Sequence, residues 1–518
     1  MVPFPESTVG EGMKSGKEML ALYKGGDDQK PNMHPKQKEL LVKLAQVGLL
    51  TVLFAYISYR ELQPLYWHMA GGLSSSKTGG YAPSSGHCEN DLKSRVPQAV
   101  TLMDIAFPWK HVKPLDVEKT HSWNVPRPEG WEPKLAAEEK RAKKWIVITS
   151  INAPTEQVEQ WSTLHPEWRL VVVGDKKSPK DFNQANCIYL PWEEQEALGY
   201  RIAKALPWNS YSRKMVGYLY AIQHGAEVVY ETDDDNGFKP DMPLTNFLPQ
   251  RAPVMTLAAD PTKKVANPYA HFGIPTMWPR GYPINAGLDK GIDADAILSY
   301  ESPVPAARFV PIQQALADLD PDVDAIFRLV RAKELGSFKF NPAAPPLSYP
   351  AGLMSPYNSQ NTVHYASAFW GLYIPGSVAM RVCDIWRSYW AQRLLWEIGG
   401  EVAFLPASVD QVRSAHDYLG DFLEEVQIYT QAGKLVSYLR AWECGKETLF
   451  DCAIKLTHDM AIAGYWGSLD VEFMEAWLAD LHDLGVENPK VTGMYKPIAM
   501  GEEATITTMT GVKVRKAL

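Results

Sequence analysis

From about residue 143 onward, short apolar runs alternate with longer segments of mixed polarity. Runs this short and rich in Val and Ile predict strands, at 145–149, 169–173, 187–190 and 226–230. The intervening segments predict helices at 155–164, 192–206 and 211–224, with Thr155 as a candidate N-cap and Gly225 as a stop. Apolar strands that alternate with helices predict an α/β fold whose mainly parallel sheet is covered on both faces.

The later part of the chain continues this pattern. We predict strands at 254–257 and 402–405, the second ending at Pro406, and a helix at 389–398 before Gly399 and Gly400. Phe369 and Trp370 are predicted to lie in an apolar core strand. Helical runs at 438–457 and 469–484 predict a helical cap or a partner surface.

One segment near the start of the sequence is long and apolar enough to cross a membrane. Residues 44–59 carry no charge, and extension back to Leu40 gives the roughly 20 residues that a bilayer requires. Three lysines oppose one glutamate before the segment, and Arg60 and Glu61 cancel after it, which favours a cytosolic N-terminus. A buried amphipathic helix is the alternative.

These patterns predict five regions with different roles. They are a cytosolic tail at 1–39, a transmembrane signal anchor at 40–60, a lumenal stem with an irregular Pro/Trp-rich part at 61–142, an α/β domain at 143–440 and a helical extension at 441–518. An anchor, a stem and a globular region are the layout of a type II resident of the Golgi or endoplasmic reticulum.

Composition excludes some functions and leaves one redox question open. The chain has 52 Lys and Arg against 60 Asp and Glu, so its net charge of −8 disfavours nucleic acid as a partner. The five cysteines form no metal-ligand spacing. Cys444 and Cys452 are close enough to form a disulfide in an oxidising lumen, but two ordinary thiols are an equal alternative.

An acidic run follows the strand predicted at 226–230. Asp233, Asp234 and Asp235 lie where a buried parallel strand ends, the edge at which α/β sheets bind ligands. Alternate residues that leave a strand can aim two carboxylates at one point, so Asp233 and Asp235 are the candidate ligands of Mn²⁺ or Mg²⁺. Such an ion neutralises a diphosphate leaving group. A solvated turn before Gly237 is the alternative.

Two further groups are candidates for the nucleotide side of this site. Gly174, Asp175 and Lys177 follow the strand predicted at 169–173. Arg213 and Lys214 open the helix predicted at 211–224, where cations oppose the helix dipole and therefore need an anionic partner. A phosphate or the acidic run would supply that partner, and ordinary exposed charges are the alternative.

Two polar segments further along the chain are candidates for sugar binding. The first is a loop after the strand predicted at 254–257, whose His271 could bind the metal or a phosphate unless it is a structural histidine. The other polar and aromatic members of this loop are Asn267, Tyr269, Trp278 and Arg280. The second segment, 358–361, could bind acceptor hydroxyls.

Several long blocks resemble the STELLO-type glycosyltransferases, Golgi type II proteins best known from plants. The resemblance spans roughly residues 143–442. Its blocks include WIVITS, VVVGDKKSPKDF, SRKMVGYLYAIQHGAEVVYETDDD, NPYAHFG, WPRGYP, PYNSQNT, SAFWGLYIP and YWAQRLLWEIGGEVAFLP. It implies a GT-A-like nucleotide-sugar fold and, in plants, association with cellulose synthase assembly. It places the family's acidic motif, including Asp234, on 233–235, where relatives vary around the full Asp-Asp-Asp of this chain.

The same resemblance exposes one departure. GT-A enzymes commonly carry an acidic pair with the catalytic base before a helix, a glycine turn and a strand, but Arg387 and Ser388 occupy that place here. The nearest acids are Asp384 and Glu397, and Glu397 could instead pair with Arg393. The other candidates for the base are Asp320, Asp322 and Asp324.

Together these features predict a metal-assisted glycosyltransferase in the Golgi lumen. It would move a sugar from a nucleotide-diphosphate-sugar donor to a glycan or protein acceptor, on a chain with a single membrane span. The missing acidic pair favours a rival, a non-catalytic assembly or trafficking factor that serves polysaccharide synthase complexes. A nucleotide-sugar mutase is a third interpretation.

Overall fold

The computed structural model describes residues 121–498 apart from 132–135, 139–140, 165, 241–247, 261, 285–297, 332–335 and 414–416. All described residues belong to one compact unit, which lies within Gln98–Leu518. The predicted membrane segment at 40–60 therefore lies outside the described residues. Within the described part, no helix combines the length and the apolar character that a membrane span requires.

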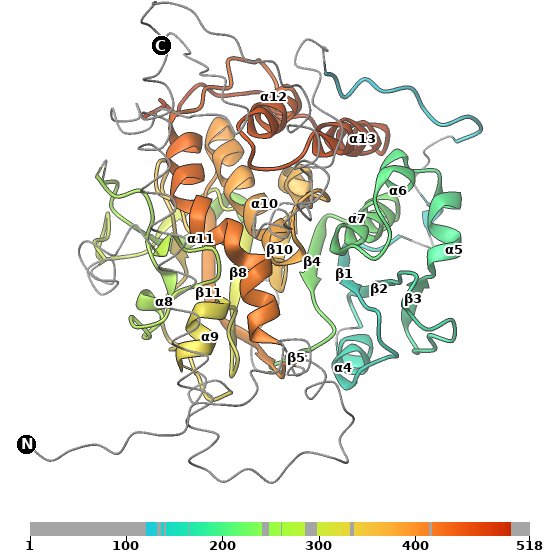
Figure 1. Cartoon of the computed structure of the whole chain (residues 1–518), viewed down its shortest axis with the longest axis horizontal. Helices are drawn as coiled ribbons and strands as arrows, with labels where there is room; N and C mark the ends of the chain where they lie inside the picture. Colours follow the sequence, from blue (N-terminus) through green and yellow to red (C-terminus); the bar gives the residue numbers. More distant parts are fainter. Residues whose placement is uncertain are drawn as a thin grey trace, which may run out of the picture. The chain divides into compact units, whose positions relative to one another are not determined.

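One half of the central sheet is parallel, as the sequence predicts (Figure 1). Its four strands lie in the order β3-β2-β1-β4, so β1, the first of the described strands, has a parallel neighbour on each side. Their bounds are β1 (Lys144–Thr149), β2 (Arg169–Val173), β3 (Cys187–Leu190) and β4 (Val228–Thr232). Each lies within two residues of its prediction.

The other half of the sheet mixes both directions. Strand β10 (Asn361–Tyr365) is antiparallel to β4 and to β8 (Ile312–Asp318), whereas β11 (Val402–Gln411) runs parallel to β8. The predicted end of this last strand at Pro406 is wrong, because β11 continues through a register shift between Leu405 and Val409. The remaining strands are β5 (Asn236–Phe238), β6 (Ala252–Thr256), β7 (Ala306–Arg308) and β9 (Leu347–Ser348).

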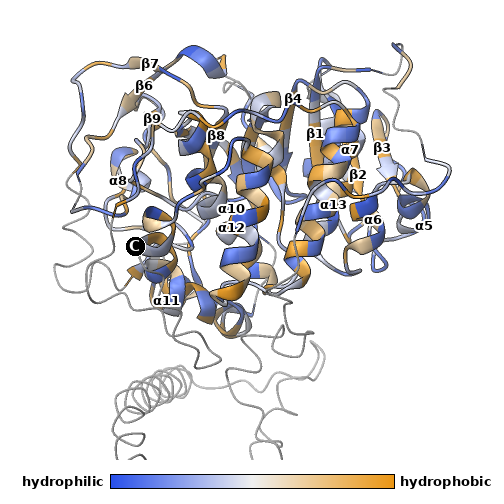
Figure 2. Ribbon diagram, turned by 90° about the horizontal axis from the view of Figure 1, so that it is seen from above, coloured by the Kyte–Doolittle hydropathy of each residue, from blue (hydrophilic) through white to orange (hydrophobic). Residues whose placement is uncertain are grey.

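Alternate residues of the parallel strands face two different helices. Trp145 and Val147 of β1 share a core with α7 (Lys214–Gln223), whereas Ile146 and Ile148 pack with α4 (Glu156–Leu164) on the other face. Figure 2 shows α7 lying along β1 and β2. A Cβ on Gly217 would lie 2.6 Å from Val173 and 2.7 Å from Val147, so this glycine lets α7 approach the sheet closely.

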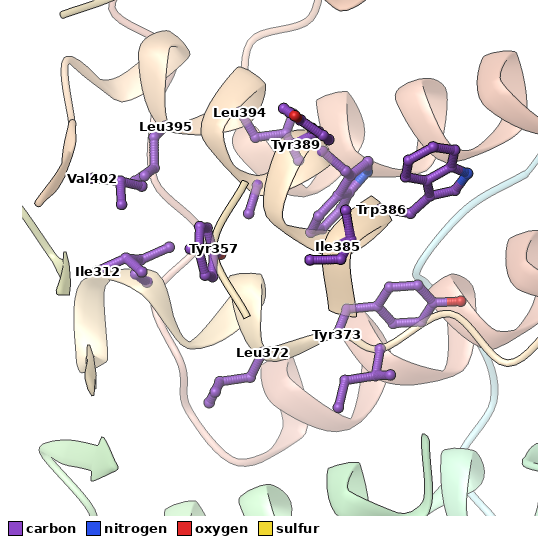
Figure 3. Packing of buried hydrophobic residues seen from close by; sticks show 14 of the residues in the cluster. Ile312, Tyr357, Leu372, Tyr373, Ile385, Trp386, Tyr389, Leu394, Leu395 and Val402 are labelled. Atoms are coloured by element: carbon purple, nitrogen blue, oxygen red, sulfur yellow. The ribbon is translucent and has the colours of Figure 1, made fainter. Parts of the chain in front are cut away.

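The C-terminal half is built around a buried helix, α10 (Met380–Leu395), rather than the shorter helix predicted at 389–398. Figure 3 shows Ile385, Trp386 and Tyr389 of α10 packed near Leu372 and Tyr373. The helices that follow share this core cluster. They are η10 (Trp396–Ile398), α11 (Tyr418–Ala441), α12 (Leu449–Ile462) and α13 (Leu469–Asp483).

Other predicted elements differ in detail from the structure. The helix predicted at 192–206 breaks at Gly199, whose positive φ of 83° ends one segment and redirects the chain. Phe369 and Trp370 are buried as predicted, but they lie in a 3₁₀ helix and not in a strand. The short helices are α5 (Trp192–Gln195), η3 (Glu196–Leu198), α6 (Arg201–Ala205), η4 (Tyr211–Arg213), η5 (Pro249–Arg251), α8 (Pro268–His271), α9 (Ala325–Arg331) and η9 (Ala366–Leu372).

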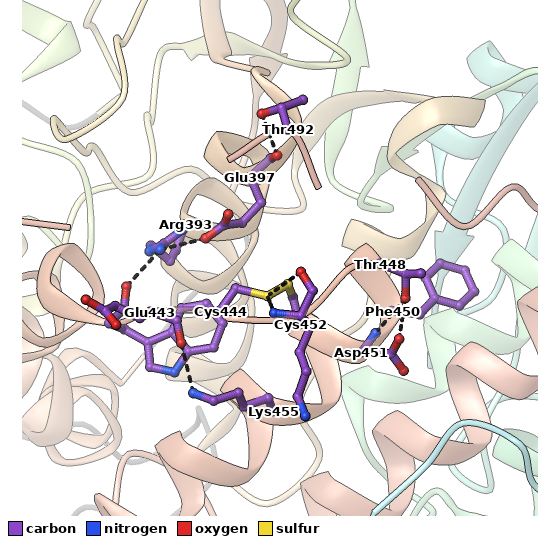
Figure 4. Close-up of a disulfide and its surroundings, with 12 residues drawn as sticks. Arg393, Glu397, Glu443, Cys444, Thr448, Phe450, Asp451, Cys452, Lys455 and Thr492 are labelled. Carbon is purple, nitrogen blue, oxygen red and sulfur yellow. Dashed lines mark hydrogen bonds and ion pairs between the residues drawn. A yellow bond between two sulfur atoms is a disulfide. The ribbon is translucent and has the colours of Figure 1, made fainter. Parts of the chain in front are cut away.

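A disulfide joins the end of α11 to the following helix. Cys444 lies after α11 and is bonded to Cys452 in α12 (Figure 4). The helical run predicted at 438–457 is therefore two helices, with the disulfide across the turn between them. Of the two alternatives for these cysteines, the structure has the bonded one.

Candidate functional site

A cavity of about 610 Å³ opens at the carboxyl ends of the parallel strands. Its walls include Thr149 at the end of β1, Val173 at the end of β2 and the acidic run 233–235 that follows β4. Among the described residues, eight acidic and five basic side chains line it: Asp175, Asp233, Asp234, Asp235, Asp322, Asp384, Asp421 and Glu424, and Lys177, Arg213, Arg280, Arg381 and Arg413. The ionised lining is therefore net negative.

Asp233 is held from the side of α7. Its Oδ1 accepts hydrogen bonds from the Tyr211 hydroxyl at 2.7 Å and from Lys214 Nζ at 3.0 Å. Lys214 is fully buried, and its Nζ also donates to the Thr232 carbonyl at 2.6 Å. The sequence predicts that a cation at this helix start has an anionic partner. For Lys214 this partner is Asp233 of the acidic run.

Asp234 turns toward the end of β1. Its Oδ2 accepts hydrogen bonds from the Ser150 hydroxyl and from Asn152 Nδ2, the latter at 3.0 Å. The Asp234 carbonyl accepts a hydrogen bond from Thr155 Oγ1 at 2.6 Å. Thr155 Oγ1 in turn accepts from Val158 N at 3.2 Å, so Thr155 caps α4 as predicted. Asp233 and Asp234 are thus held by different strands and helices.

Asp235 lies against the end of β11. Its carboxylate accepts hydrogen bonds from Gln411 Nε2 at 3.0 Å and from Asn236 Nδ2 at 3.1 Å. Burial raises the pKa of Asp235 to about 6, and the neighbouring charge of Asp233 adds to this effect. The acidic run is therefore a concentration of negative charge that its own surroundings neutralise only in part.

This chemistry fits a hard divalent cation. Mg²⁺ and Mn²⁺ need only one or two protein carboxylates, because substrate phosphates and water complete the shell. Asp233 and Asp234 each present one carboxylate oxygen without a hydrogen bond from a described residue. No group of three or more His, Cys, Asp or Glu residues within the described ranges converges on one metal position. The predicted ligand pair, Asp233 and Asp235, stays a prediction.

The predicted nucleotide side is at the same cavity. Gly174, Asp175 and Lys177 all line it, at the end of β2. The Asp175 carboxylate accepts hydrogen bonds from Lys176 N at 2.6 Å and from Ser210 N at 3.1 Å, so it joins two loops of the wall. Lys177 is exposed.

Arg213 lines the cavity, but its guanidinium has other partners. Gln195 Oε1 accepts from its Nε at 2.9 Å, the Ala203 carbonyl accepts from Nη1 at 2.6 Å, and its centre lies 3.8 Å from the Trp208 ring. Burial lowers the pKa of Arg213 to about 10. These contacts hold the wall together and leave the proposed phosphate contact of Arg213 without support from the geometry.

A buried three-residue ion cluster also lines the cavity. Arg280 donates to Asp322 through Nε and Nη2, both at 2.9 Å, and to Asp384 through Nη1 at 3.0 Å and Nη2 at 2.8 Å. Burial disfavours the charged form of Asp322, but the Arg280 charge and hydrogen bonds overcome it and lower the pKa of that carboxyl. Asp384, the first candidate base, is thus in the cavity and oriented by Arg280.

Two predicted site residues lie elsewhere. Glu397 does not line the cavity, and it forms an ion pair with Arg393 at 2.8 Å, the alternative predicted from their spacing (Figure 4). His271 is also outside the lining, and its ring nitrogens contact the Tyr300 hydroxyl at 2.8 Å and the Pro345 carbonyl at 2.7 Å. Each of these residues has a partner within the fold, and their predicted roles at the site stay predictions without support from the cavity.

Several lining residues carry no signal in the sequence. Tyr211, Arg381 and Arg413 have no motif that marks them, since each reaches the cavity only through the packing of the segment that carries it, which is η4, α10 or the residues after β11. In the segment predicted to bind acceptor hydroxyls, Ser359 and Gln360 line the cavity, whereas Asn358 Nδ2 donates to Asp322 Oδ2 at 2.8 Å.

Comparison with known proteins identifies relatives of this chain. Residues 381–505 match the family described as STELLO glycosyltransferases. Over 365 residues the chain is 35% identical to "Probable glycosyltransferase STELLO1" and 36% identical to "Probable glycosyltransferase STELLO2", both of Arabidopsis thaliana. Each match covers 68% of this chain and 46% of the relative, so the chain spans less than half the length of these relatives. The chain belongs to the STELLO glycosyltransferase family.

Proposed function

We propose that this protein transfers a sugar from a nucleotide-diphosphate-sugar donor to a hydroxyl of a glycan or protein acceptor, with the help of a divalent cation. One observation carries the proposal. Asp233, Asp234 and Asp235 line a cavity of about 610 Å³ at the carboxyl ends of parallel strands, together with Gly174 and Asp175 from the neighbouring strand end. The resemblance to GT-A-like enzymes and the names of the relatives agree with it.

The charge of the cavity is the reason for proposing a cation. A donor diphosphate is an anion, and the described part of the lining holds eight acidic and five basic side chains. Like charges in a shared site repel, so the donor requires added positive charge. Asp233 and Asp235 are the proposed ligands of Mn²⁺ or Mg²⁺. Such an ion would neutralise negative charge on the leaving diphosphate.

In the proposed transfer, the acceptor hydroxyl oxygen bonds to the anomeric carbon of the sugar. The bond from that carbon to the diphosphate oxygen breaks, and the nucleoside diphosphate leaves with the electron pair. The hydroxyl proton passes to a carboxylate base. Of the candidate bases, Asp384 and Asp322 line the cavity, and we assign the role to Asp384, whose position Arg280 holds.

We place this activity in the Golgi lumen, on a type II protein anchored by residues 40–60. The disulfide between Cys444 and Cys452 supports the lumenal placement, since such bonds persist in oxidising compartments. Association with polysaccharide synthase complexes, which the resemblance implies, is part of the same proposal.

One observation favours a second candidate, a non-catalytic assembly factor on the same fold. Arg387 occupies the place where the resemblance leads us to expect a catalytic carboxylate, and its guanidinium is bonded to Glu231. A chain of this kind would keep the fold, but it would neither bind the donor through a metal ion nor transfer a sugar.

Binding of nucleoside diphosphates to the full chain in detergent separates the two candidates. We expect uridine or guanosine diphosphate to bind in the presence of Mn²⁺, and the binding to be lost without the metal and in Asp233→Asn plus Asp235→Asn. Glu472→Gln plus Glu487→Gln is the matched control, because it removes two exposed charges outside the cavity. Nucleotide binding that is the same without Mn²⁺ and in the Asp233 and Asp235 double variant would contradict the proposed enzymatic function.

A stability measurement must accompany this test. Asp233→Asn leaves Lys214 buried without its carboxylate partner, so the variant loses stability for a reason unrelated to the metal. A thermal melt that still shows one cooperative transition above the assay temperature makes a loss of binding meaningful.

A further inference from the structure

The five basic side chains of the cavity differ in how completely they are partnered. Arg280 is held by two aspartates, Arg381 donates to Glu425 at 2.9 and 2.6 Å, and Arg213 is bonded to Gln195. Lys177 is exposed at the rim. The fifth, Arg413, is buried but is incompletely paired.

Arg413 is a buried cation with incomplete pairing. Its side chain is only 7% exposed, and among described residues its single ion-pair contact is to Asp421, at 3.8 Å, beyond hydrogen-bond distance. Its Nε is buried and has no hydrogen-bond partner in the part of the chain that the structure describes. Burial lowers the pKa of Arg413 to about 10, and the nearby charges of Arg328 and Arg381 add to this effect. A buried guanidinium of this kind is costly unless an anion completes its hydrogen bonds.

The position of Arg413 indicates which anion would complete its hydrogen bonds. It follows β11 directly, where Val412 N donates to the Asp235 carbonyl at 3.2 Å and Gln411 donates to the Asp235 carboxylate at 3.0 Å. The backbone before Arg413 therefore adjoins the proposed metal site, and the charge of Arg413 acts on Asp235 at that site and on Asp322 elsewhere in the lining.

We propose that Arg413 binds the diphosphate of the donor and stabilises the charge of the leaving nucleoside diphosphate. This inference rests on the proposed function. The planar guanidinium presents donors in a fork that matches two phosphate oxygens, which a lysine cannot reproduce. Binding supplies the acceptor oxygens that the buried Nε lacks. A carboxylate of an acidic acceptor sugar is the competing occupant, and the experiment distinguishes it.

The test measures two affinities in the full chain, that of Mn²⁺ alone and that of uridine or guanosine diphosphate in saturating Mn²⁺. The variants are Arg413→Gln and Arg413→Lys, and Arg251→Gln, an exposed arginine outside the cavity, is the control. We expect Arg413→Gln to lower the nucleotide affinity by roughly 10- to 100-fold, the range for a hydrogen bond to a charged group. The nucleotide affinity of Arg413→Lys should lie between those of the unmodified chain and Arg413→Gln.

Mn²⁺ alone separates a lost contact from a damaged fold. Removal of a positive charge near Asp235 should leave the affinity for Mn²⁺ unchanged or raise it, whereas misfolding would lower both affinities. If Arg413→Gln does not fold, Arg413→Lys provides the test: a lower nucleotide affinity with an unchanged affinity for Mn²⁺ supports the inference.

The possible failures are distinguishable. No nucleotide binding by the unmodified chain overturns the proposed function and this inference together. Normal binding by the unmodified chain and, within about twofold, by both Arg413 variants overturns this inference alone, and leaves an acidic acceptor as the occupant.

Discussion

Arg387 of α10 forms two hydrogen bonds with Glu231 of β4, from Nη1 at 3.0 Å and from Nη2 at 2.7 Å. Both side chains are fully buried, and the Tyr218 hydroxyl of α7 donates to the same carboxylate. Glu231 lies two residues before Asp233. The ion pair therefore joins the central helix of the C-terminal half to the strand that carries the acidic run.

Loss of one partner of this pair should destabilise the fold strongly. Arg387→Met leaves Glu231 buried without its cation, and we expect the free energy of unfolding to fall by about 3–5 kcal/mol. Urea denaturation measures it. Arg251→Met, at an exposed arginine, should change it by less than about 0.5 kcal/mol. Arg387→Met combined with Glu231→Gln should recover part of the loss, and equal effects of the Arg387 and Arg251 variants would contradict the prediction.

Tyr211 should contribute to cation binding through Asp233. Tyr211→Phe keeps the ring but removes one of the two donors that orient Asp233 Oδ1. Because a hydrogen bond of this kind contributes about 0.5–1.5 kcal/mol, we expect the affinity for Mn²⁺ to fall roughly two- to tenfold. Tyr220→Phe, on α7 but outside the cavity lining, is the control. An affinity for Mn²⁺ that is the same in both variants would show that Asp233 needs no such orientation.

A buried carboxyl should make stability depend on pH. Burial raises the pKa of Asp324 to about 7, and the charge of Glu425 adds to this effect. The folded chain keeps this proton up to pH 7, whereas an unfolded aspartate loses it near pH 4. The folded state therefore binds more protons between these values, and the free energy of unfolding contributed by Asp324 falls as pH rises from about 4 to 7.

Asp324→Asn removes this titration and should flatten the slope by up to about 1.4 kcal/mol per pH unit within that window. Urea denaturation at pH 5, 6, 7 and 8 measures it, with Glu472→Gln as the exposed control. The amide also disturbs hydrogen bonds from Phe327 N and Trp278 Nε1, so the slope is informative and the absolute stability is not. Parallel curves for the variant and the unmodified chain would refute the assignment.

The sequence by itself determined the parallel half of the sheet and the place of the acidic run. Strands such as 145–149 and 169–173 are short, continuous and apolar because both of their faces are buried, and that signal is local. The same holds for the cap at Thr155 and the stop at Gly225. The long blocks that resemble STELLO-type proteins were also identified from the sequence alone.

Only the tertiary structure decided how the polar residues of the site are used. Arg213 and Lys214 are neighbours in the sequence with the same charge, yet one is bonded to Gln195 and the other to Asp233. Arg280 and Asp384 are 104 residues apart and form one cluster. Hydrogen bonds and ion pairs depend on distances of about 3 Å between segments far apart in the chain, and no local pattern of apolar and polar residues encodes those distances.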